Sequence, residues 1–284
     1  MHTVTETANA KINLFLDVTD RRTDGFHNIR SIMHSVSLAD SLILSAERSG
    51  ATCISLAVDG ADLSADRDNL VYRAIEAYLS RTGISAKVTA RLTKRIPIGA
   101  GLGGGSSDAA ATLRAMNSIF RLLTVGELSE LAACLGSDVP YCLGGGTALC
   151  GGRGELITSM TLPDKMHLVI AIGDDRTSTP TAYKALDELY HGFDGTVSTL
   201  GGEYYSRFTD SGDICDALYN VFEAVAPPSV ASLKSRLISL GAISALMSGS
   251  GPSVFAIFDS ADMARNACAA LVAEGILAEY ATSV

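Results

Sequence analysis

The alternation of apolar and polar residues near the start of the chain predicts its first element. From residue 11 to residue 18 every second residue is Ile, Leu or Val, and those between them are Lys11, Asn13, Phe15 and Asp17. A period of two is that of a β-strand, so Lys11 and Asn13 should share one face. Residues 20–26 predict a charged loop ending in an Asp-Gly turn, and residues 29–44 predict a returning strand.

A helical period appears after two turn-rich stretches. Residues 69–79 repeat apolar side chains at i and i+4 and stop at Gly83, which predicts a helix. Further elements are expected at 53–58 and 86–92 (strands), 109–120 and 126–135 (helices), and 137–140 (a polar turn containing a proline). The glycine-rich stretch 97–108 therefore lies between a strand and a long helix.

The second half of the chain mixes both periods without a regular alternation of strand and helix. The predicted elements are strands at 168–172, 242–247, 254–258 and the chain end, and helices at 181–190, 213–225, 230–240 and 261–274. Residues 144–150 are glycine-rich and then strand-like, and residues 193–212 show no period. This mixture favours an α+β fold. The run Gly151-Gly-Arg-Gly154 is the best boundary, which gives two domains, 1–154 and 155–284.

Composition narrows the class of protein. The 284 residues carry a formal net charge of −9, and an acidic surface attracts neither nucleic acid nor a membrane surface. The six cysteines form no C-x-x-C pair and lie mostly in apolar surroundings, which favours buried thiols in a reducing compartment. The N-terminus lacks a signal-peptide pattern, and no stretch approaches a membrane span in length. We therefore expect a cytoplasmic protein that is a monomer or a weak homodimer.

The stretch 97–108 predicts an anion-binding site. Glycines let backbone N–H groups turn toward one point, and the following helix adds unpaired N–H donors and the positive end of its dipole. Phosphate groups of a nucleotide suit such a site. Gly99, Gly101 and Gly104 match G-x-G-x-x-G, but the acidic residue that a dinucleotide fold needs about 20 residues later is missing. The Walker pattern also fails, because Gly105 stands where its lysine belongs.

Two polar residues are candidates for chemistry beside a phosphate site. Asp138, in the turn after a helix, is either a general base for an acceptor hydroxyl or a helix-capping residue, and spacing alone favours the cap. Lys11 is either an edge-strand guard or a buried functional ammonium.

The remaining polar candidates are less specific. His27 follows a turn and is by default a solvent-facing loop residue, whereas His34 in a predicted strand is structural. The second glycine loop, Gly249-Ser-Gly251, is either a tight turn or a second group of N–H donors. Since no His, Cys, Asp or Glu grouping has metal-ligand spacing, a divalent ion such as Mg²⁺ would arrive with the nucleotide.

Taken together, several segments resemble the GHMP kinase superfamily. They are Ala10-Lys-Ile-Asn-Leu-Phe-Leu16, Arg22-Thr-Asp-Gly-Phe-His27, Asp68-Asn-Leu-Val71, the stretch 94–108, Leu135-Gly-Ser-Asp-Val-Pro140 and Ser248-Gly-Ser-Gly-Pro-Ser253. They occur in the family's order and cover the chain nearly end to end. The first two segments resemble one branch, whose members use ATP to phosphorylate the 2-hydroxyl of a cytidine-diphosphate ester of methylerythritol in the non-mevalonate isoprenoid pathway. The resemblance implies an N-terminal domain like ribosomal protein S5 domain 2 and a ferredoxin-like C-terminal domain.

The resemblance also implies roles for individual residues. Asp138 would take the hydroxyl proton, and Lys11 would hold that carboxylate and the substrate oxygens. The ATP site would comprise Asn69, Lys94, Pro97, Ile98, Gly99, Ala100, Gly101, Leu102, Gly103, Gly104, Gly105, Ser106 and Ser107. The substrate site would comprise Asn13, Phe26, His27, Asp138, Thr179 and Tyr183, with His27 on the cytosine and the two aromatic rings stacked near it. The family usually has tyrosine where this chain has Phe26, so any contact of a phenol hydroxyl is lost here.

Three rival classes follow from the same features. A sister kinase acting on homoserine, mevalonate or galactose would share the glycine loop but lack the Asp-Gly-aromatic-His segment. An oxidoreductase would need the missing acidic residue. An RNA-binding module, suggested only by the S5-like fold, is inconsistent with the acidic charge.

Overall fold

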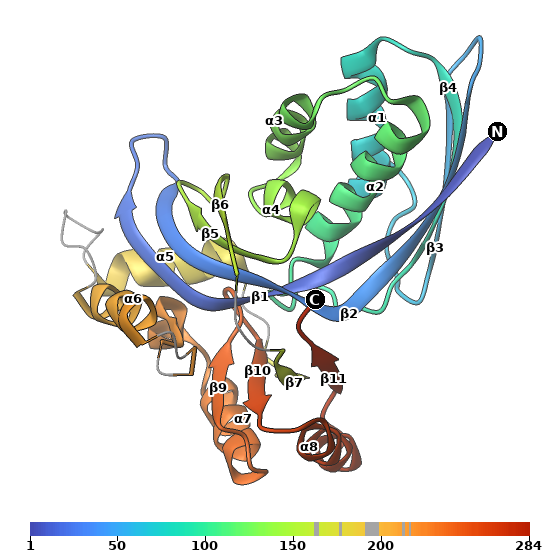
Figure 1. The fold of residues 1–284 in the computed structure, drawn as a ribbon. Helices are drawn as coiled ribbons and strands as arrows, with labels where there is room; N and C mark the ends of the chain where they lie inside the picture. Colours follow the sequence, from blue (N-terminus) through green and yellow to red (C-terminus); the bar gives the residue numbers. More distant parts are fainter. Residues whose placement is uncertain (162–164, 176–177, 191–198, 212–213, 216) are drawn as a thin grey trace. The chain divides into compact units, whose positions relative to one another are not determined.

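The computed structural model describes residues 1–161, 165–175, 178–190, 199–211, 214–215 and 217–284, and these form two compact units. Unit 1 comprises Met1–Ala10, Ala39–Ile98 and Gly103–Gly145, and unit 2 comprises Lys11–Leu38, Gly99–Leu102 and Gly146–Val284. Two long strands, β1 (His2–Arg21) and β2 (His27–Arg48), contribute residues to both (Figure 1). The segment Gly151–Gly154 turns between two paired strands, and the division at residue 154 stays a prediction.

The sheet of unit 1 follows the order β3-β4-β2-β1. β3 (Cys53–Asp59) is parallel to β4 (Ala86–Thr93), and β4 is antiparallel to the second half of β2, with Ser41 opposite Thr93. Every second residue of β4 is buried, as expected for a strand with one face on a core. The period-two segments are confirmed as strands.

Four helices of unit 1 begin and end at residues with recognisable local signals. They are α1 (Leu70–Thr82), α2 (Gly104–Phe120), α3 (Val125–Leu135) and α4 (Val139–Gly144). The Asn69 side chain accepts a hydrogen bond from the backbone of α1, and Gly83 ends that helix at a φ of 67°. Thr124 and Glu127 form a reciprocal capping box at α3.

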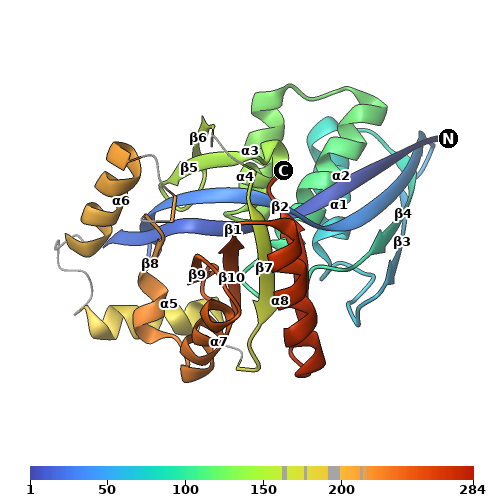
Figure 2. The ribbon, with the colours of Figure 1, turned by 60° about the horizontal axis from the view of Figure 1, so that its bottom comes forward.

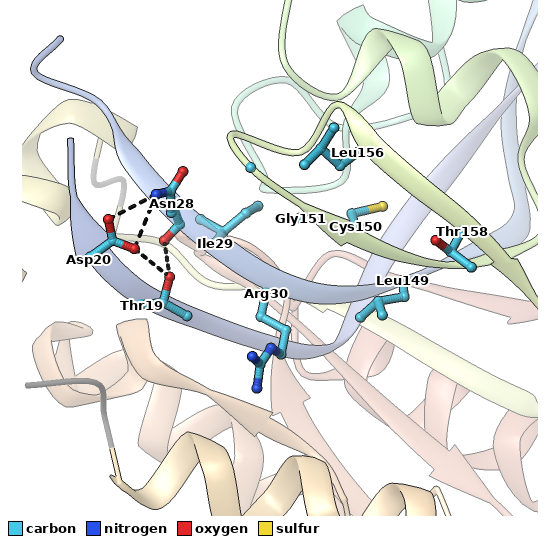
Figure 3. Close-up of a pocket in the computed structure, with 11 residues that line it drawn as sticks. Thr19, Asp20, Asn28, Ile29, Arg30, Leu149, Cys150, Gly151, Leu156 and Thr158 are labelled. Atoms are coloured by element: carbon cyan, nitrogen blue, oxygen red, sulfur yellow. Dashed lines mark hydrogen bonds between the residues drawn. The ribbon is translucent and has the colours of Figure 1, made fainter. Parts of the chain in front are cut away.

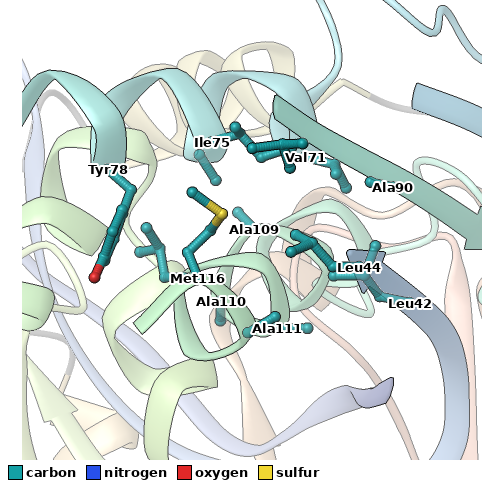
Figure 4. Close-up of a cluster of buried hydrophobic side chains, with 14 of the residues drawn as sticks. Leu42, Leu44, Val71, Ile75, Tyr78, Ala90, Ala109, Ala110, Ala111 and Met116 are labelled. Carbon is teal, nitrogen blue, oxygen red and sulfur yellow. The ribbon is translucent and has the colours of Figure 1, made fainter. Parts of the chain in front are cut away.

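The core of unit 1 lies between α1, α2 and the sheet. Ile75 and Tyr78 of α1 and Met116 of α2 are fully buried, beside Leu42 and Leu44 of β2 (Figure 4). The consecutive alanines 109–111 keep α2 narrow, so that it packs closely on α1 and β2. This packing holds the first turn of α2, which follows the glycine loop, on a rigid support.

Unit 2 contains a second, antiparallel sheet in the order β11-β7-β10-β9. Its strands are β7 (His167–Ile172), β9 (Ser244–Met247), β10 (Ser253–Phe258) and β11 (Ala278–Thr282). Helices α7 (Pro228–Ser239) and α8 (Ala261–Ala273) pack against these strands (Figure 2). In chain order the strands are arranged 4-1-3-2, which confirms the ferredoxin-like expectation.

The remaining strands of unit 2 pair with the second half of β1, with the first half of β2, or with each other. β5 (Thr147–Gly151) pairs with β2 and with β6 (Leu156–Met160), and the short β8 (Tyr219–Asn220) runs parallel to β1. Helices α5 (Thr179–Leu189) and α6 (Thr199–Ser211) belong to the same unit.

Several expectations about secondary structure are wrong. The expected turn at 137–140 continues into α4, because Pro140 lies in the first helical turn, where its missing N–H costs nothing. Residues 199–211, expected to be irregular, form α6; the rest of that expected segment, 193–198 and Gly212, lies outside the described residues. Residues 213 and 216 of the helix expected over 213–225 lie outside the described residues; in the described part the chain forms β8 and the 3₁₀ helix Val221–Val225, since pairing with β1 overrides the local helical pattern.

Two further expectations need correction. Gly104–Ser107 form the first turn of α2 rather than loop, so the glycine-rich stretch is shorter than its composition suggests. Of the six cysteines Cys150 alone is buried, whereas Cys53 and Cys134 are exposed, because each exposed thiol lies on the outer face of its element.

Candidate active site

Three positive backbone angles shape the glycine loop before α2. Gly99, Gly101 and Gly103 have φ values of 68°, 75° and 69°, in a region that residues with a Cβ rarely adopt. Gly103 is the N-cap of α2, and no side chain caps the helix from that position. The N–H groups of the first turn therefore remain available to an anion, which matches the predicted phosphate site.

The second glycine loop packs against the centre of the first one. A Cβ on Gly101 would lie 2.3 Å from the Ser248 carbonyl oxygen, and a Cβ on Gly249 would lie 3.0 Å from the Gly101 carbonyl oxygen. The Ser253 hydroxyl donates a hydrogen bond to the Ala100 carbonyl oxygen. Both glycines thus permit two backbones to approach each other, and this packing supports residues 99–102.

Lys11 is a buried ammonium rather than an edge-strand guard. Its relative exposure is 4%, and its Nζ donates a 2.7 Å hydrogen bond to Oδ1 of Asn13. Asn13 donates to the Ser31 hydroxyl at 2.8 Å, and the Lys11 backbone N–H donates to the Leu102 carbonyl oxygen at 2.9 Å. The predicted shared face of Lys11 and Asn13 is confirmed. The backbone of Lys11 is hydrogen-bonded to Leu102, the last residue of the segment Gly99–Leu102.

His27 is buried, so its default interpretation as a solvent-facing loop residue is wrong. It begins β2, and its side chain is 7% exposed. The ring stacks on Tyr183 of α5 at 4.8 Å between centroids, and Nε2 lies 2.7 Å from Oδ1 of Asp187. Tyr183 in turn meets the edge of Phe222 at 4.9 Å. Unit 2 therefore brings together His27 and Tyr183, two of the predicted substrate residues.

Two other predicted substrate residues of unit 2 contact neighbours that the sequence did not single out. Phe26 is 48% exposed, and the guanidinium carbon of Arg153 lies 3.6 Å from its ring centroid. The Thr179 hydroxyl is 3.0 Å from that of Ser250, in the second glycine loop.

Asp138, in unit 1, occupies the N-cap position of α4 without capping it. Its side chain makes no hydrogen bond to the backbone of that helix, so the capping interpretation lacks the bond that defines it. The preceding turn lies against α2, because a Cβ on Gly136 would be 4.0 Å from the Ser106 hydroxyl. Ser107 donates to Sγ of Cys142 in α4 at 3.4 Å. Asp138 is thus held close to the first turn of α2.

Lys94 belongs to a buried charge cluster in unit 1. Its Nζ donates to Oδ2 of Asp40 and, at 2.7 Å, to Oδ2 of Asp108. Oδ1 of Asp40 accepts from the backbone N–H of Ile96 at 2.8 Å. Burial raises the pKa of Asp108 to about 7, although Lys94 opposes that shift. The cluster links the residues just before the glycine loop to the helix just after it.

Asn69, the other residue predicted on the adenine side, uses its side chain locally. Oδ1 accepts from the Val71 N–H at 2.9 Å, and Nδ2 donates to the Ser64 carbonyl oxygen at 2.8 Å. Its neighbour Leu70 reaches α2, since a Cβ on Gly105 would lie 3.2 Å from Cδ1 of Leu70. Asn69 therefore places the start of α1 beside the start of α2.

None of the predicted site residues lines a pocket of about 360 Å³ in unit 2 (Figure 3). It is lined by Thr19, Asp20, Asn28, Ile29, Arg30, Leu149, Cys150, Gly151, Gly152, Leu156 and Thr158. Nδ2 of Asn28 donates to both carboxylate oxygens of Asp20, at 2.8 and 3.1 Å, so these polar groups are already paired.

Sequence reasoning missed Asp187, Asp40 and Asp108, although each contacts a predicted residue. Asp108 directly follows the glycine-serine run and carried a usable signal, whereas Asp187 is 160 residues from His27 and carried none. Within the described ranges no cluster of His, Cys, Asp and Glu is arranged to hold a metal ion, and no helix is long and apolar enough to cross a membrane.

Comparisons with known proteins agree with this geometry. Residues 69–146 match the family described as GHMP kinases N terminal domain, and residues 210–277 match GHMP kinases C terminal. The chain is 40% identical over 270 residues to the 4-diphosphocytidyl-2-C-methyl-D-erythritol kinase of Pelotomaculum thermopropionicum, covering 94% of this chain and 93% of that protein.

Solved structures give the same relationship. A crystal structure of 4-(cytidine 5'-diphospho)-2C-methyl-D-erythritol kinase has a TM-score of 0.80 at 33% identity, with 99% of both chains covered. The homoserine kinase of Cytophaga hutchinsonii has a TM-score of 0.75 at 20% identity, covering all of this chain and 95% of that one, and shows a shared fold alone. The chain therefore belongs to the 4-diphosphocytidyl-2-C-methyl-D-erythritol kinase family of the GHMP kinases.

Proposed function

We propose that this ATP-dependent small-molecule kinase transfers a phosphoryl group to the 2-hydroxyl of 4-diphosphocytidyl-2-C-methyl-D-erythritol, in the non-mevalonate isoprenoid pathway. The observation that carries the proposal is the uncapped N-terminus of α2, preceded by Gly99, Gly101 and Gly103 at positive φ. Phosphoryl transfer depends mainly on holding phosphates and neutralising charge, and such a helix start supplies N–H donors without moving.

The stretch from Pro97 to Ser107 is the proposed ATP phosphate site. Its outer residues, Pro97, Ile98 and 103–107, belong to unit 1, and its centre, Gly99–Leu102, belongs to unit 2. Asn69 and Lys94 are the proposed adenine-side residues. Both side chains are hydrogen-bonded to neighbouring protein groups, so they would form a rigid wall of the site. Mg²⁺ would arrive with ATP and neutralise phosphate charge.

Asp138 and Lys11 are the proposed catalytic residues. Asp138 precedes α4 and lies close to the first turn of α2, where its carboxylate would accept the proton of the acceptor hydroxyl. A buried ammonium stabilises negative charge more strongly than an exposed one, because little solvent screens it.

His27, Tyr183, Phe26, Asn13 and Thr179 are the proposed substrate-binding residues, all in unit 2. The exposed ring of Phe26, and the buried His27 stacked on the half-buried Tyr183, suit a flat pyrimidine base with polar edges. We further propose that the chain works in the cytoplasm, as a monomer or a weak homodimer.

The test is a coupled assay of ADP release with three acceptors offered in parallel: the cytidine-diphospho substrate, homoserine and mevalonate. Turnover with the first at least 100-fold above the other two is expected. A preference for homoserine or mevalonate would overturn the proposal. Phosphorus NMR of the product checks that the new phosphate is on the 2-hydroxyl.

A further inference from the structure

The contact between His27 and Asp187 joins residues from distant parts of unit 2. Asp187 lies on α5, and its Oδ1 is 2.7 Å from Nε2 of His27. The carboxylate is 19% exposed and the imidazole 7% exposed, so water competes little for this contact. Arg21 is the other charged group near the carboxylate, with Nη1 3.6 Å from Oδ2 and a half-exposed side chain.

The chemistry of this contact selects one form of the imidazole. An ionised carboxylate only accepts hydrogen bonds, so the nitrogen that faces it must carry the proton. In a neutral imidazole the other nitrogen then holds a lone pair. A neutral His27 therefore has Nε2–H directed at Asp187 and Nδ1 as a hydrogen-bond acceptor.

The stacking on Tyr183 limits rotation of the His27 ring. The two ring planes are 24° apart, and Tyr183 is itself held against Phe222. Rotation about the Cβ–Cγ bond of His27 would break both the stack and the bond to Asp187. The orientation of the ring and the identity of its acceptor nitrogen are thus set together.

We propose that Asp187 is a positioning residue that makes this kinase selective for a base with an amino group at position 4. The inference rests on the proposed function, in which His27 contacts the pyrimidine. An acceptor at Nδ1 suits the amino group of cytosine and repels the carbonyl oxygen that uracil carries at the same position. Asp187 acts through His27 and touches neither the base nor the reacting atoms.

The matched test compares Asp187→Asn with Glu188→Gln. Both exchange a carboxylate for an amide on α5, but Glu188 is exposed, with Nζ of Lys184 at 3.9 Å. An asparagine amide can either donate to Nε2 or accept from it, so the substitution removes the preference for one form of the imidazole with little change in shape. Cytidine 5'-diphosphate and uridine 5'-diphosphate serve as probes, and calorimetry gives the dissociation constant of each.

The wild type and Glu188→Gln should bind the cytidine probe about tenfold or more tighter than the uridine probe. Asp187→Asn should weaken cytidine binding about tenfold and nearly abolish the preference. Nitrogen-15 shifts of the His27 ring provide a readout that a purely structural role would not move. Protonated Nε2 is expected in the wild type, with protonation moving toward Nδ1 in Asp187→Asn.

An unchanged base preference in Asp187→Asn, or protonated Nδ1 in the wild type, would overturn the inference. So would a wild type that binds neither probe. Turnover of the full substrate tests the proposed function separately. If the wild type prefers the cytidine probe in an Asp187-dependent way but does not phosphorylate the substrate, the proposed function fails and the inference stands.

Discussion

At the scale of single residues, the buried ammonium of Lys11 is held by hydrogen bonds beside the second glycine loop. Burying an ammonium costs free energy unless it is hydrogen-bonded, and Nζ of Lys11 donates to Asn13, which is anchored on Ser31. A Cβ on Gly249 would lie 3.5 Å from Nζ, so the second glycine loop runs beside the ammonium.

Lys11→Met should lower kcat strongly, by about 10²-fold or more, because a buried charge near the phosphate-binding residues is lost and no other group replaces it. The measurement is kcat at saturating ATP, together with light scattering for aggregation. Lys87→Met, on an exposed position of β4, is the matched control and should retain normal turnover. Normal kcat in a folded Lys11→Met variant would remove Lys11 from the proposed catalytic residues.

Asp138→Asn should reduce kcat about 10²–10⁴-fold while ATP affinity stays nearly constant, as expected for loss of a general base. Nucleotide affinity is measured by calorimetry and kcat by coupled assay. Asp262→Asn, an exposed carboxylate in the first turn of α8, controls for a generic charge effect at a helix start. Near-normal turnover in Asp138→Asn would remove Asp138 from the catalytic residues.

At the scale of elements, the glycine-rich stretch leads directly into the first turn of α2. The helix holds its first turn rigid through the alanine-rich packing on α1, and the loop delivers the chain into that turn through left-handed glycines. In unit 1, Lys94 precedes the glycine-rich stretch and Asp108 lies in α2. The ion pairs of Lys94 with Asp40 and Asp108 therefore connect the residues before the stretch to the helix after it. We therefore expect anion binding at the proposed site to depend on backbone shape more than on any one side chain.

Gly103→Val should abolish ATP binding, because a β-branched residue is strained at a φ of 69° and displaces the first N–H groups of α2. Calorimetry with ATP is the measurement, and circular dichroism checks folding. In Gly126→Val, the matched control in α3, the added Cβ meets nothing within 4 Å and φ is ordinary, so ATP affinity should persist. Unchanged affinity in a folded Gly103→Val variant would contradict the proposed phosphate site.

At the scale of the whole molecule, two buried titratable groups make stability depend on pH in opposite directions. Burial lowers the pKa of His34 to about 4, while burial raises that of Asp108 to about 7. Nε2 of His34 and Oδ1 of Asp108 have no hydrogen-bond partner among the described residues. Each group is therefore favoured in its neutral form by the fold.

Between about pH 6.5 and pH 4 the unfolded chain binds a proton at His34 that the native chain does not, so stability falls as the pH falls. His34→Gln should reduce this loss by at most about 1.4 kcal/mol per pH unit. Urea unfolding at pH 7 and pH 4.5 measures the effect. His2→Gln, at an exposed histidine, should behave like the wild type, and an equal acid loss in His34→Gln would refute the prediction.

For Asp108 the dependence of stability on pH has the opposite sign. Between about pH 4 and pH 7 the native chain retains a proton that the unfolded chain releases, so stability falls as the pH rises through that window. Asp108→Asn should flatten this dependence, because the amide stays neutral and has nearly the same shape. Urea unfolding at pH 5 and pH 8 is the measurement, and an unaltered slope would mean that Asp108 stays ionised in the native state.

The sequence alone determined the features that depend on short-range signals. Asn69 and Gly83 bound α1 because a cap and a left-handed glycine act within one helical turn. The alternation in β1 was sufficient for the strand and for the shared face of Lys11 and Asn13, since backbone periodicity is a local property. The anion site that the glycine run predicts stays a proposal. The family also followed from such short segments.

Only the tertiary structure decided the features that depend on packing between distant parts of the sequence. His27 follows a polar turn, yet α5 supplies Tyr183 and Asp187 from more than 150 residues away and buries it. The role of the second glycine loop depends on the approach of Ser248 to Gly101, which neither sequence stretch specifies. Local patterns describe the conformation of a segment, but the partner of a buried polar group is chosen by the free energy of the whole packed chain.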